Sequence, residues 1–374
     1  MVLTQRLPAS LTALDAALAA LLRNLVPVAP VELPLADALG CAAADMPRLE
    51  PFPLRDVAAN DGWAFRASDL IGASSYSPLS VATPLLWVEA GAPMPDHCDC
   101  IVDTDAVEQT GPIAQVVAEA VPGQGVRSAG SHIAGGMAAI GAGRMVTARD
   151  LLVARNAGLQ RLNVRRPRLR LVNIPAISGD TATVQLIAES ARASGAEVVR
   201  ADAKGRDAES IAKALETGAC DFLVTIGGTG VGRTDATITA LAARGEVLAH
   251  GIALLPGRTA AVGRIGAIPV VALPGAPDQA FGVWRTIALA ALDRLSARHQ
   301  RPTQTLPLHR KIASQVGVTE VVLLETSGNG WMPISVGDLS LAAIARADGL
   351  LVVPGTSEGF AAGTPVDAYI LRDE

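Results

Sequence analysis

The sequence predicts a multidomain protein of the α/β plus β class, in which a doubly wound parallel α/β domain lies between two β-rich regions. Strand-like and helix-like segments alternate between residues 166 and 302, which is typical of a parallel sheet with helices on both faces. Short strand-like runs separated by glycines and prolines fill residues 50–165 and return after residue 303. The 374 residues suffice for two to four domains.

Four domains are expected from these changes in pattern. Residues 1–48 and 135–165 would form an N-terminal helical and linker domain, and residues 49–134 a small β-rich domain inserted into it, so this region is expected to be elongated. Residues 166–302 would form the α/β domain, and residues 303–374 a small C-terminal β-barrel domain. Arg301-Pro-Thr-Gln-Thr is the expected linker between the last two.

The N-terminal half contains one predicted helix and several predicted strands. Leucines at helical spacing predict an amphipathic helix over residues 10–25, with Ser10 as its N-cap. Prolines from residue 27 onward end this helix. Farther along, Leu85-Leu-Trp-Val-Glu and Ala114-Gln-Val-Val-Ala predict short strands of the inserted domain.

The α/β domain is predicted from four strands and the helices between them. The strands are expected at residues 169–174, 197–202, 220–226 and 268–273, and the helices at 182–194, at 208–217 and up to residue 244. Gly195 and Gly218 follow the first two helices, where glycine commonly ends a helix. In the C-terminal domain, Glu320-Val-Val-Leu-Leu-Glu and Gly349-Leu-Leu-Val-Val-Pro predict strands.

Composition and charge argue against several classes of protein. The net charge of −5 argues against a nucleic-acid binder, which needs a basic surface. No apolar run approaches the roughly 18 residues of a membrane span, and the first residues lack the pattern of a signal peptide. The four cysteines form no CxxC pair, so free thiols are expected. Together these features predict a cytoplasmic protein.

A glycine-rich turn, Thr225-Ile-Gly-Gly-Thr-Gly-Val-Gly-Arg-Thr-Asp, connects a predicted strand to a predicted helix. In an open α/β sheet, ligands bind where strands end and helix N-termini expose amides, and glycine lets the backbone approach a phosphate closely. The spacing matches neither a Walker loop nor the fingerprint of a nicotinamide dehydrogenase. The turn is therefore either only a tight turn or a phosphate cradle. The cradle residues would be Gly227, Gly228, Thr229, Gly230 and Gly232.

Asp235 ends this turn, and its position allows two interpretations. It stands where the helix is expected to begin, so its carboxylate would serve as an N-cap. Alternatively it would bind a cation, because a carboxylate beside a phosphate is repulsive unless a cation lies between them. Mg²⁺ is bound in this way, by one or two carboxylates together with phosphate oxygens.

Two further turns contain both proline and glycine. Leu273-Pro-Gly-Ala-Pro-Asp follows another strand of the predicted sheet, so it should border the same crevice. The residues expected to contribute are Pro274, Gly275 and Pro277. Leu255-Pro-Gly-Arg-Thr is the other turn, in which Arg258 is expected to meet an anion.

The motifs of the chain resemble, in family order, those of the molybdopterin molybdenumtransferases, which include the E domain of gephyrin. Asn60-Asp-Gly-Trp-Ala-Phe-Arg is similar to the family's Met-Asp-Gly-Tyr-Ala-Val-Arg, and Ala90-Gly-Ala-Pro-Met-Pro to its Thr-Gly-Ala-Pro-Leu-Pro. The glycine-rich turn resembles the family's signature loop. Leu255-Pro-Gly-Arg resembles its Lys-Pro-Gly-Lys, and Leu273-Pro-Gly-Ala-Pro its Leu-Pro-Gly-Asn-Pro.

The resemblance implies a cytoplasmic homodimer whose α/β domain binds molybdopterin. The implied activity inserts molybdenum, from molybdate, into molybdopterin that arrives as its adenylate; AMP leaves, and Mg²⁺ assists. By their motifs, Asp61, Asp180 and Asp235 would be the catalytic residues, and Asp61 and Asp235 the metal ligands.

The chain departs from the family pattern at charged positions. Gly130, Ser131 and His132 stand where the family has Gly-Glu-Asp, and the family's Thr-Gly-Asp-Glu-Leu has no counterpart after the first α/β strand. A magnesium site that loses most of its carboxylates loses affinity, whereas an imidazole favours softer metals or donates a hydrogen bond. Two functions therefore stay open: a divergent molybdenumtransferase, or a non-catalytic protein that binds the pterin cofactor and delivers it to a molybdoenzyme.

Overall fold

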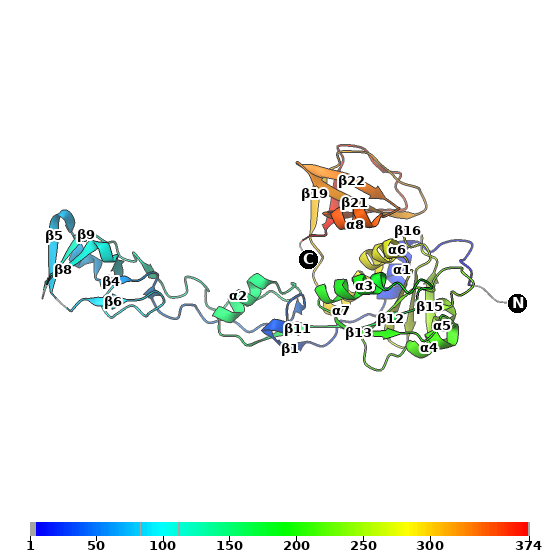
Figure 1. Ribbon diagram of the computed structural model, residues 1–374, viewed down its shortest axis with the longest axis horizontal. Helices are drawn as coiled ribbons and strands as arrows, with labels where there is room; N and C mark the ends of the chain where they lie inside the picture. The colour runs from blue at the N-terminus through cyan, green and yellow to red at the C-terminus, as the bar shows by residue number, and fades with distance from the viewer. Residues whose placement is uncertain (1–4, 83, 111–112, 373–374) are drawn as a thin grey trace. The chain divides into compact units, whose positions relative to one another are not determined.

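The computed structural model describes residues 5–82, 84–110 and 113–372, and the chain divides into two compact units. Residues 1–45, 141–147 and 161–374 belong to the first unit, and residues 46–140 and 148–160 to the second. The α/β sheet and the C-terminal strands both lie in the first unit (Figure 1). None of the helices in the described ranges has the length and apolar character needed to cross a membrane.

A six-stranded sheet with the order β13-β12-β14-β18-β17-β15 forms the α/β part of the first unit. The strands are β12 (Arg168–Asn173), β13 (Glu197–Asp202), β14 (Phe222–Ile226), β15 (Glu246–His250), β17 (Ala261–Ile265) and β18 (Ile268–Leu273). The four from β13 to β18 are parallel, as predicted. β17 and β15 were not predicted, and they run antiparallel to their neighbours. Only two residues separate β17 from β18, which is long enough for a hairpin and too short for a crossover.

Helices cover both faces of this sheet, so the domain is doubly wound, as predicted. On one face lie α4 (Ala208–Ala214) and α5 (Thr237–Arg244); on the other lie α1 (Leu14–Leu22), α3 (Ala182–Ala193), α6 (Pro277–Val283) and α7 (Leu289–Ser296). A five-residue π-helix, Trp284–Ala288, joins α6 to α7. Successive strand residues alternate between the faces: Leu171 packs with α3 and its neighbours, and Val172 with α4 and α5.

The N-terminal helix α1 is shorter than predicted. It begins at Leu14, and Ala13 rather than Ser10 is its N-cap, without a side-chain hydrogen bond. Leu14, Ala17 and Leu21 are buried in the same core as one face of the sheet. The apolar spacing therefore predicted the buried face of the helix, and the capping signal misplaced its first turn.

The C-terminal β domain contains a sheet of order β16-β21-β23-β25-β19, with β22 beside β21. Its strands are β16 (Leu254–Leu255), β19 (Thr303–Pro307), β21 (Thr319–Ser327), β22 (Gly330–Val336), β23 (Gly349–Val353) and β25 (Pro365–Ile370). Beside it, β20 (Ile312–Ala313) pairs with β24 (Gly359–Phe360), and α8 (Leu341–Arg346) follows an N-cap at Ser340. Because β16 pairs with β21, the turn Leu255-Pro-Gly-Arg begins in this sheet and not in the α/β sheet.

The rest of the described chain contains further short strands. In the second unit they are β3 (Val57–Ala58), β4 (Gly62–Phe65), β5 (Ser74–Ala82), β6 (Leu86–Val88), β7 (Cys100–Val102), β8 (Val107–Thr110), β9 (Ile113–Ala118) and β10 (Val126–Arg127), with the helix α2 (Ala148–Asn156). They form sheets of order β6-β4-β7, β5-β9-β8 and β10-β3. In the first unit, β1 (Val31–Pro34), β2 (Ala42–Ala43) and β11 (Arg161–Arg165) form one more small sheet.

Candidate functional site

A cavity of about 490 Å³ lies at the C-terminal ends of β12, β14 and β18. β12 and β14 are neighbours, but the chain leaves them in opposite directions, from β12 to β13 and from β14 toward β18. In doubly wound sheets such a reversal of strand order opens a crevice where ligands bind. The turns after the three strands line this cavity with residues 173–174, 227–230 and 274–277.

Two glycines determine the path of the glycine-rich turn. Gly227 and Gly228 have φ angles of 95° and 68°, in the left-handed region that residues with a Cβ atom rarely adopt. A Cβ on Gly228 would also lie 2.4 Å from Oγ1 of Thr237, the first residue of α5. The turn is therefore packed so closely against the start of α5 that a side chain at position 228 does not fit.

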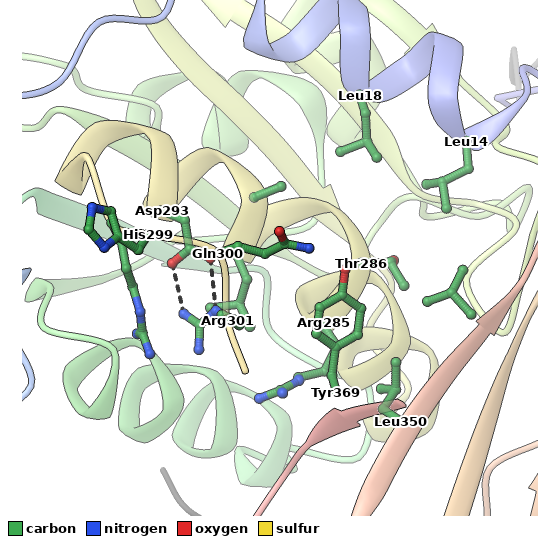
Figure 2. Close-up of a pocket in the computed structure, with 14 residues that line it drawn as sticks. Leu14, Leu18, Arg285, Thr286, Asp293, His299, Gln300, Arg301, Leu350 and Tyr369 are labelled. Atoms are coloured by element: carbon green, nitrogen blue, oxygen red, sulfur yellow. Dashed lines mark hydrogen bonds and ion pairs between the residues drawn. The ribbon is translucent and has the colours of Figure 1, made fainter. Parts of the chain in front are cut away.

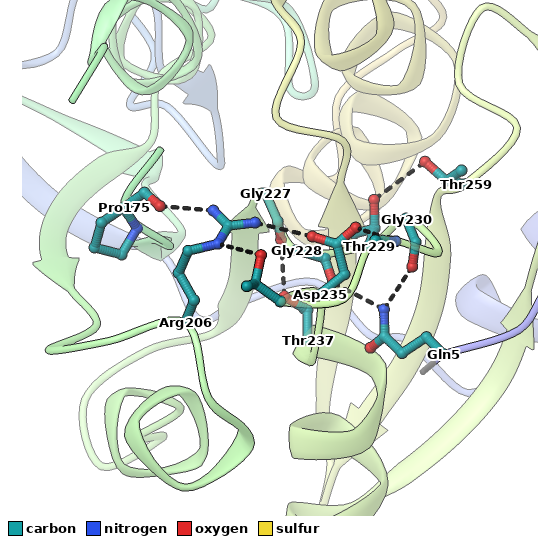
Figure 3. Close-up of polar contacts among 12 residues, drawn as sticks. Gln5, Pro175, Arg206, Gly227, Gly228, Thr229, Gly230, Asp235, Thr237 and Thr259 are labelled. Atoms are coloured by element: carbon teal, nitrogen blue, oxygen red, sulfur yellow. Dashed lines mark hydrogen bonds and ion pairs between the residues drawn. The ribbon is translucent and has the colours of Figure 1, made fainter. Parts of the chain in front are cut away.

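Side chains from distant parts of the chain hold the carbonyl groups of this turn (Figure 3). The Gln5 side-chain amide donates to the carbonyls of Gly228 and Gly230, at 3.0 and 2.8 Å. Thr237 donates to the Gly227 carbonyl at 2.8 Å, and Nε2 of His250 lies 3.1 Å from the Thr229 carbonyl oxygen. Four successive carbonyls are thus bound within the protein.

Three amide groups of the same turn are left available. Within the described part of the chain, the N–H groups of Gly228, Thr229 and Gly230 donate to no protein acceptor. Thr229 is only 2% exposed, and buried N–H groups rarely stay without a partner. Bound carbonyls beside available amides are the arrangement expected where a backbone binds an anion.

The second predicted turn lies against the first. A Cβ on Gly275 would lie 3.4 Å from the Cα atom of Gly227, so the two turns meet backbone to backbone. Thr183, near the start of α3, donates from its hydroxyl to the Gly275 carbonyl at 2.9 Å. Pro274, Gly275 and Pro277 all line the cavity, which places the two sequence motifs around one space.

The structure contradicts one of the two local interpretations of Asp235. α5 begins at Thr237 after an Ala236 N-cap without a side-chain bond, so the prediction that Asp235 caps this helix is wrong. Its Oδ1 accepts a hydrogen bond from Nη2 of Arg206 at 2.9 Å, and its Oδ2 accepts one from the Gly232 amide at 3.0 Å. Asp235 and Arg206 form an ion pair that is largely shielded from solvent, with 17% and 23% of the side chains exposed.

Arg206 is a site residue that the sequence analysis missed. It follows β13, and besides Asp235 its guanidinium bonds to the Pro175 carbonyl at 2.6 Å and to Oγ1 of Thr234 at 3.1 Å (Figure 3). It is the only basic residue among the described residues that line the cavity. A cation soon after the predicted parallel strand at residues 197–202 was a signal that could have found it, because parallel strands of one sheet end at the same edge.

The remaining predicted residues lie in three different places. Asp180 lines the cavity, and its Oδ1 accepts a hydrogen bond from the Ala182 amide at 2.8 Å, in the first turn of α3. Gly232 and Arg258 are not among the lining residues, and Arg258 is exposed. Asp61 belongs to the second unit, where its Oδ1 accepts a hydrogen bond from the Ala90 amide at 2.7 Å and so connects two of the family-like motifs.

The described residues of the cavity do not by themselves complete a magnesium site. Over the described ranges, no three side chains of His, Cys, Asp or Glu lie close enough together to hold a metal ion. Both carboxylate oxygens of Asp235 already accept hydrogen bonds, and Asp180 is bonded to its own helix. Mg²⁺ requires a near-octahedral shell of oxygen ligands, and the side chains of the described cavity supply too few free oxygens for one.

A second cavity of the first unit, of about 320 Å³, has a different character (Figure 2). It lies among α1, the π-helix, α7 and strands of the C-terminal sheet, with Leu14 and Leu350 on its walls. Arg301 and Asp293 face each other there, with bonds of 2.8 and 2.9 Å. Neither the glycine-rich turn nor the turn Leu273-Pro-Gly-Ala-Pro lines this cavity. It is therefore not the phosphate site that the sequence predicts.

Comparisons with known proteins give one consistent result. Three family models match consecutive parts of the chain: the MoeA N-terminal region (domain I and II) at residues 12–158, a "Probable molybdopterin binding domain" at 177–294, and the MoeA C-terminal region (domain IV) at 306–371. The chain belongs to the MoeA family. The resemblance inferred from the motifs is thereby confirmed, and most residues that line the cavity lie in the part matched by the molybdopterin binding domain.

Relatives of the MoeA family match over nearly the whole chain. Molybdopterin molybdenumtransferase 2 of Mycobacterium tuberculosis is 27% identical over 388 residues, which cover 91% of this chain and 95% of that protein. Molybdopterin molybdenumtransferase 1 of the same organism is 25% identical over 404 residues, with the same coverage of 91% and 95%. The molybdopterin biosynthesis MoeA protein of Pyrococcus horikoshii OT3 has the same fold, with a TM-score of 0.71, 20% identity and coverage of 97% of this chain and 100% of that one.

Proposed function

We propose that this protein acts in molybdenum cofactor biosynthesis as a molybdopterin molybdenumtransferase-like protein that binds adenylylated molybdopterin at the cavity of the α/β sheet. The observation that carries this proposal is the glycine-rich turn. Its carbonyls are bound by Gln5, Thr237 and His250, while the amides of residues 228–230 have no protein acceptor in the described chain. Such amides at the rim of a doubly wound sheet suit the phosphate groups of the ligand.

The reaction proposed is the insertion of molybdenum from molybdate, with release of AMP. Hydrolysis of the adenylate adds one water molecule across the phosphoanhydride, which leaves AMP and the phosphate of molybdopterin. Negative charge grows on the phosphoryl oxygens in this step, and preorganised amides of the turn would stabilise it. Asp180, at the edge of the cavity, is the proposed acid–base residue. Asp61 is proposed as a further catalytic residue only from its motif.

A second candidate is binding and delivery of the cofactor without turnover. Two observations favour it: the carboxylate of Asp235 is paired with Arg206, and Ser131 and His132 stand where the family motif has two acids. A delivery protein needs the phosphate turn and the cavity but no general base. It would be expected to bind a molybdoenzyme client.

One assay separates the two candidates. The purified protein is incubated with adenylylated molybdopterin and molybdate, with Mg²⁺ or with excess EDTA, and AMP and bound pterin are both measured. AMP release that Asp180→Asn abolishes and the exposed control Asp15→Asn does not would support the transferase. Bound pterin without AMP would support delivery, and failure to bind any pterin would refute both. Light scattering on the same sample tests the homodimer that the family resemblance implies.

A further inference from the structure

Arg206 is the basic residue among the described residues that line the candidate phosphate site. We propose that the guanidinium of Arg206 supplies the cation that this site needs, in the place of a divalent metal ion, and that Asp235 positions it. This inference rests on the proposed function, because it concerns how the same cavity accepts a phosphate ligand. Arg206 is a residue that the sequence motifs did not identify, and Asp235 receives a role other than the metal ligand that the motifs implied.

The charges of the cavity require a cation. Asp180 and Asp235 are the acidic residues of the described lining, and both lie beside the turns that would hold the phosphates. A phosphate brought next to these carboxylates would be repelled, most strongly by Asp235, whose side chain is only 17% exposed. Arg206 is the one basic side chain in the described lining, so it must compensate for this repulsion unless an ion does.

The geometry of Arg206 leaves it able to bind an anion. Its guanidinium uses one N–H on Nε for Thr234, one on Nη1 for Pro175 and one on Nη2 for Asp235. A guanidinium has five N–H donors in a planar fork, so one on Nη1 and one on Nη2 remain. Two donors held in one plane match two phosphate oxygens, and the three existing bonds fix that plane before a ligand arrives.

The same contacts make Asp235 unsuited to bind a metal. One carboxylate oxygen is 2.9 Å from Arg206, and the other is 3.0 Å from the Gly232 amide. A divalent ion on Asp235 would have to lie near the guanidinium, where like charges repel. The role left to this carboxylate is to position Arg206.

The test measures binding of molybdopterin, released anaerobically from a molybdoenzyme, to the intact protein by equilibrium dialysis. We expect the same dissociation constant with Mg²⁺ and with excess EDTA. Arg206→Gln should weaken binding by about tenfold or more, because it removes charged hydrogen bonds. Arg206→Lys should retain part of the affinity, since it keeps the charge but loses the fork. The matched control is Arg168→Gln, which breaks the 2.8 Å ion pair with Asp221 in the same domain but away from the cavity.

A double variant separates direct binding of the ligand from a structural role. If Arg206 served only to neutralise Asp235, combining Arg206→Gln with Asp235→Asn would restore the affinity. We expect the affinity to stay low, because the donors to the phosphate are still missing. Restored affinity, or binding that needs Mg²⁺, would overturn this inference while leaving the proposed function intact. No binding of the pterin under any condition would overturn both.

Discussion

Gln5 and Gly228 are 223 residues apart in the sequence, yet the side-chain amide of Gln5 donates to the Gly228 carbonyl at 3.0 Å. The same amide group reaches the Gly230 carbonyl, and the side-chain oxygen of Gln5 accepts from the Ile238 amide at 2.7 Å. One side chain thus connects the glycine-rich turn to the first turn of α5. The segment before α1 is therefore part of the site, because it fixes the turn that would hold the phosphate.

Replacing Gln5 by alanine should loosen this turn. Three hydrogen bonds are lost, two of them to carbonyls of the turn, and bonds of this kind stabilise a fold by about 1 kcal/mol each. We expect a free energy of unfolding lowered by about 1–3 kcal/mol and weaker binding of molybdopterin. Denaturant unfolding and equilibrium dialysis measure the two effects. Gln185→Ala, at an exposed position of α3, is the control, and equal effects of the two substitutions would contradict the assigned role of Gln5.

Gly228→Ala should be the more severe change. Position 228 has a left-handed φ of 68°, and its new Cβ would meet Oγ1 of Thr237 at 2.4 Å. Strain alone costs a residue with a Cβ about 1–2 kcal/mol, and the clash adds to this cost. Gly266→Ala separates the two effects, because Gly266 has a φ of 60° but nothing within 4 Å of the added Cβ.

We expect Gly228→Ala to abolish pterin binding and to lower the melting temperature more than Gly266→Ala does. Thermal unfolding and dialysis on the same samples measure both. If the two alanine variants were equally stable and both bound the pterin, the close packing of the turn against Thr237 would have no functional importance.

These long-range contacts mark the limit of what the sequence could predict. Period and glycine placement predicted the parallel strands β12, β13, β14 and β18 and the turn after β14, because local spacing determines which residues can be buried. The antiparallel strands β15 and β17 were missed. The short apolar runs between glycines in this region do not show whether a strand forms or in which direction it would run. Gln5 and Arg206 were missed for a different reason: each acts on the glycine-rich turn only after distant segments have packed together.

The local interpretation of Asp235 was wrong for the same reason. Its place before a helix suggested an N-cap, but Ala236 lies between it and Thr237, where α5 begins, and is the N-cap residue. The carboxylate instead meets a guanidinium from the loop after β13, a parallel strand that β12 separates from β14 in the sheet. The spacing of residues along the chain does not identify Arg206 as the partner of Asp235. The two side chains come close only because of the order of the strands in the sheet.

His250 should make the turn sensitive to acid. Burial lowers the pKa of His250 below its usual value of 6.5, although its contact with the Thr229 carbonyl raises it in part. A histidine with a lowered pKa binds fewer protons in the folded than in the unfolded state, so the free energy of unfolding falls as the pH falls through about 6.5.

We therefore expect the protein to melt at a lower temperature at pH 5.5 than at pH 7.5. His250→Gln retains an N–H donor for the Thr229 carbonyl but does not titrate, so it should remove part of this difference. Calorimetry of both proteins over this pH range makes the comparison. An identical pH dependence in the variant would mean that other groups cause the whole effect.

Arg206→Ala should be open to chemical rescue. The substitution removes the guanidinium but leaves the acceptors that surround it, namely the Pro175 carbonyl, Thr234 and Asp235. Methylguanidinium added to the buffer can occupy the same place, since these acceptors match its planar donors. Pterin affinity should rise with its concentration, whereas methylammonium at the same ionic strength should have little effect. Combining Arg206→Ala with Asp235→Asn removes the negative charge that anchors the added cation, so rescue should fail there. Rescue that persists in the double variant would show that the cation acts through general screening of charge, and that Asp235 does not position it.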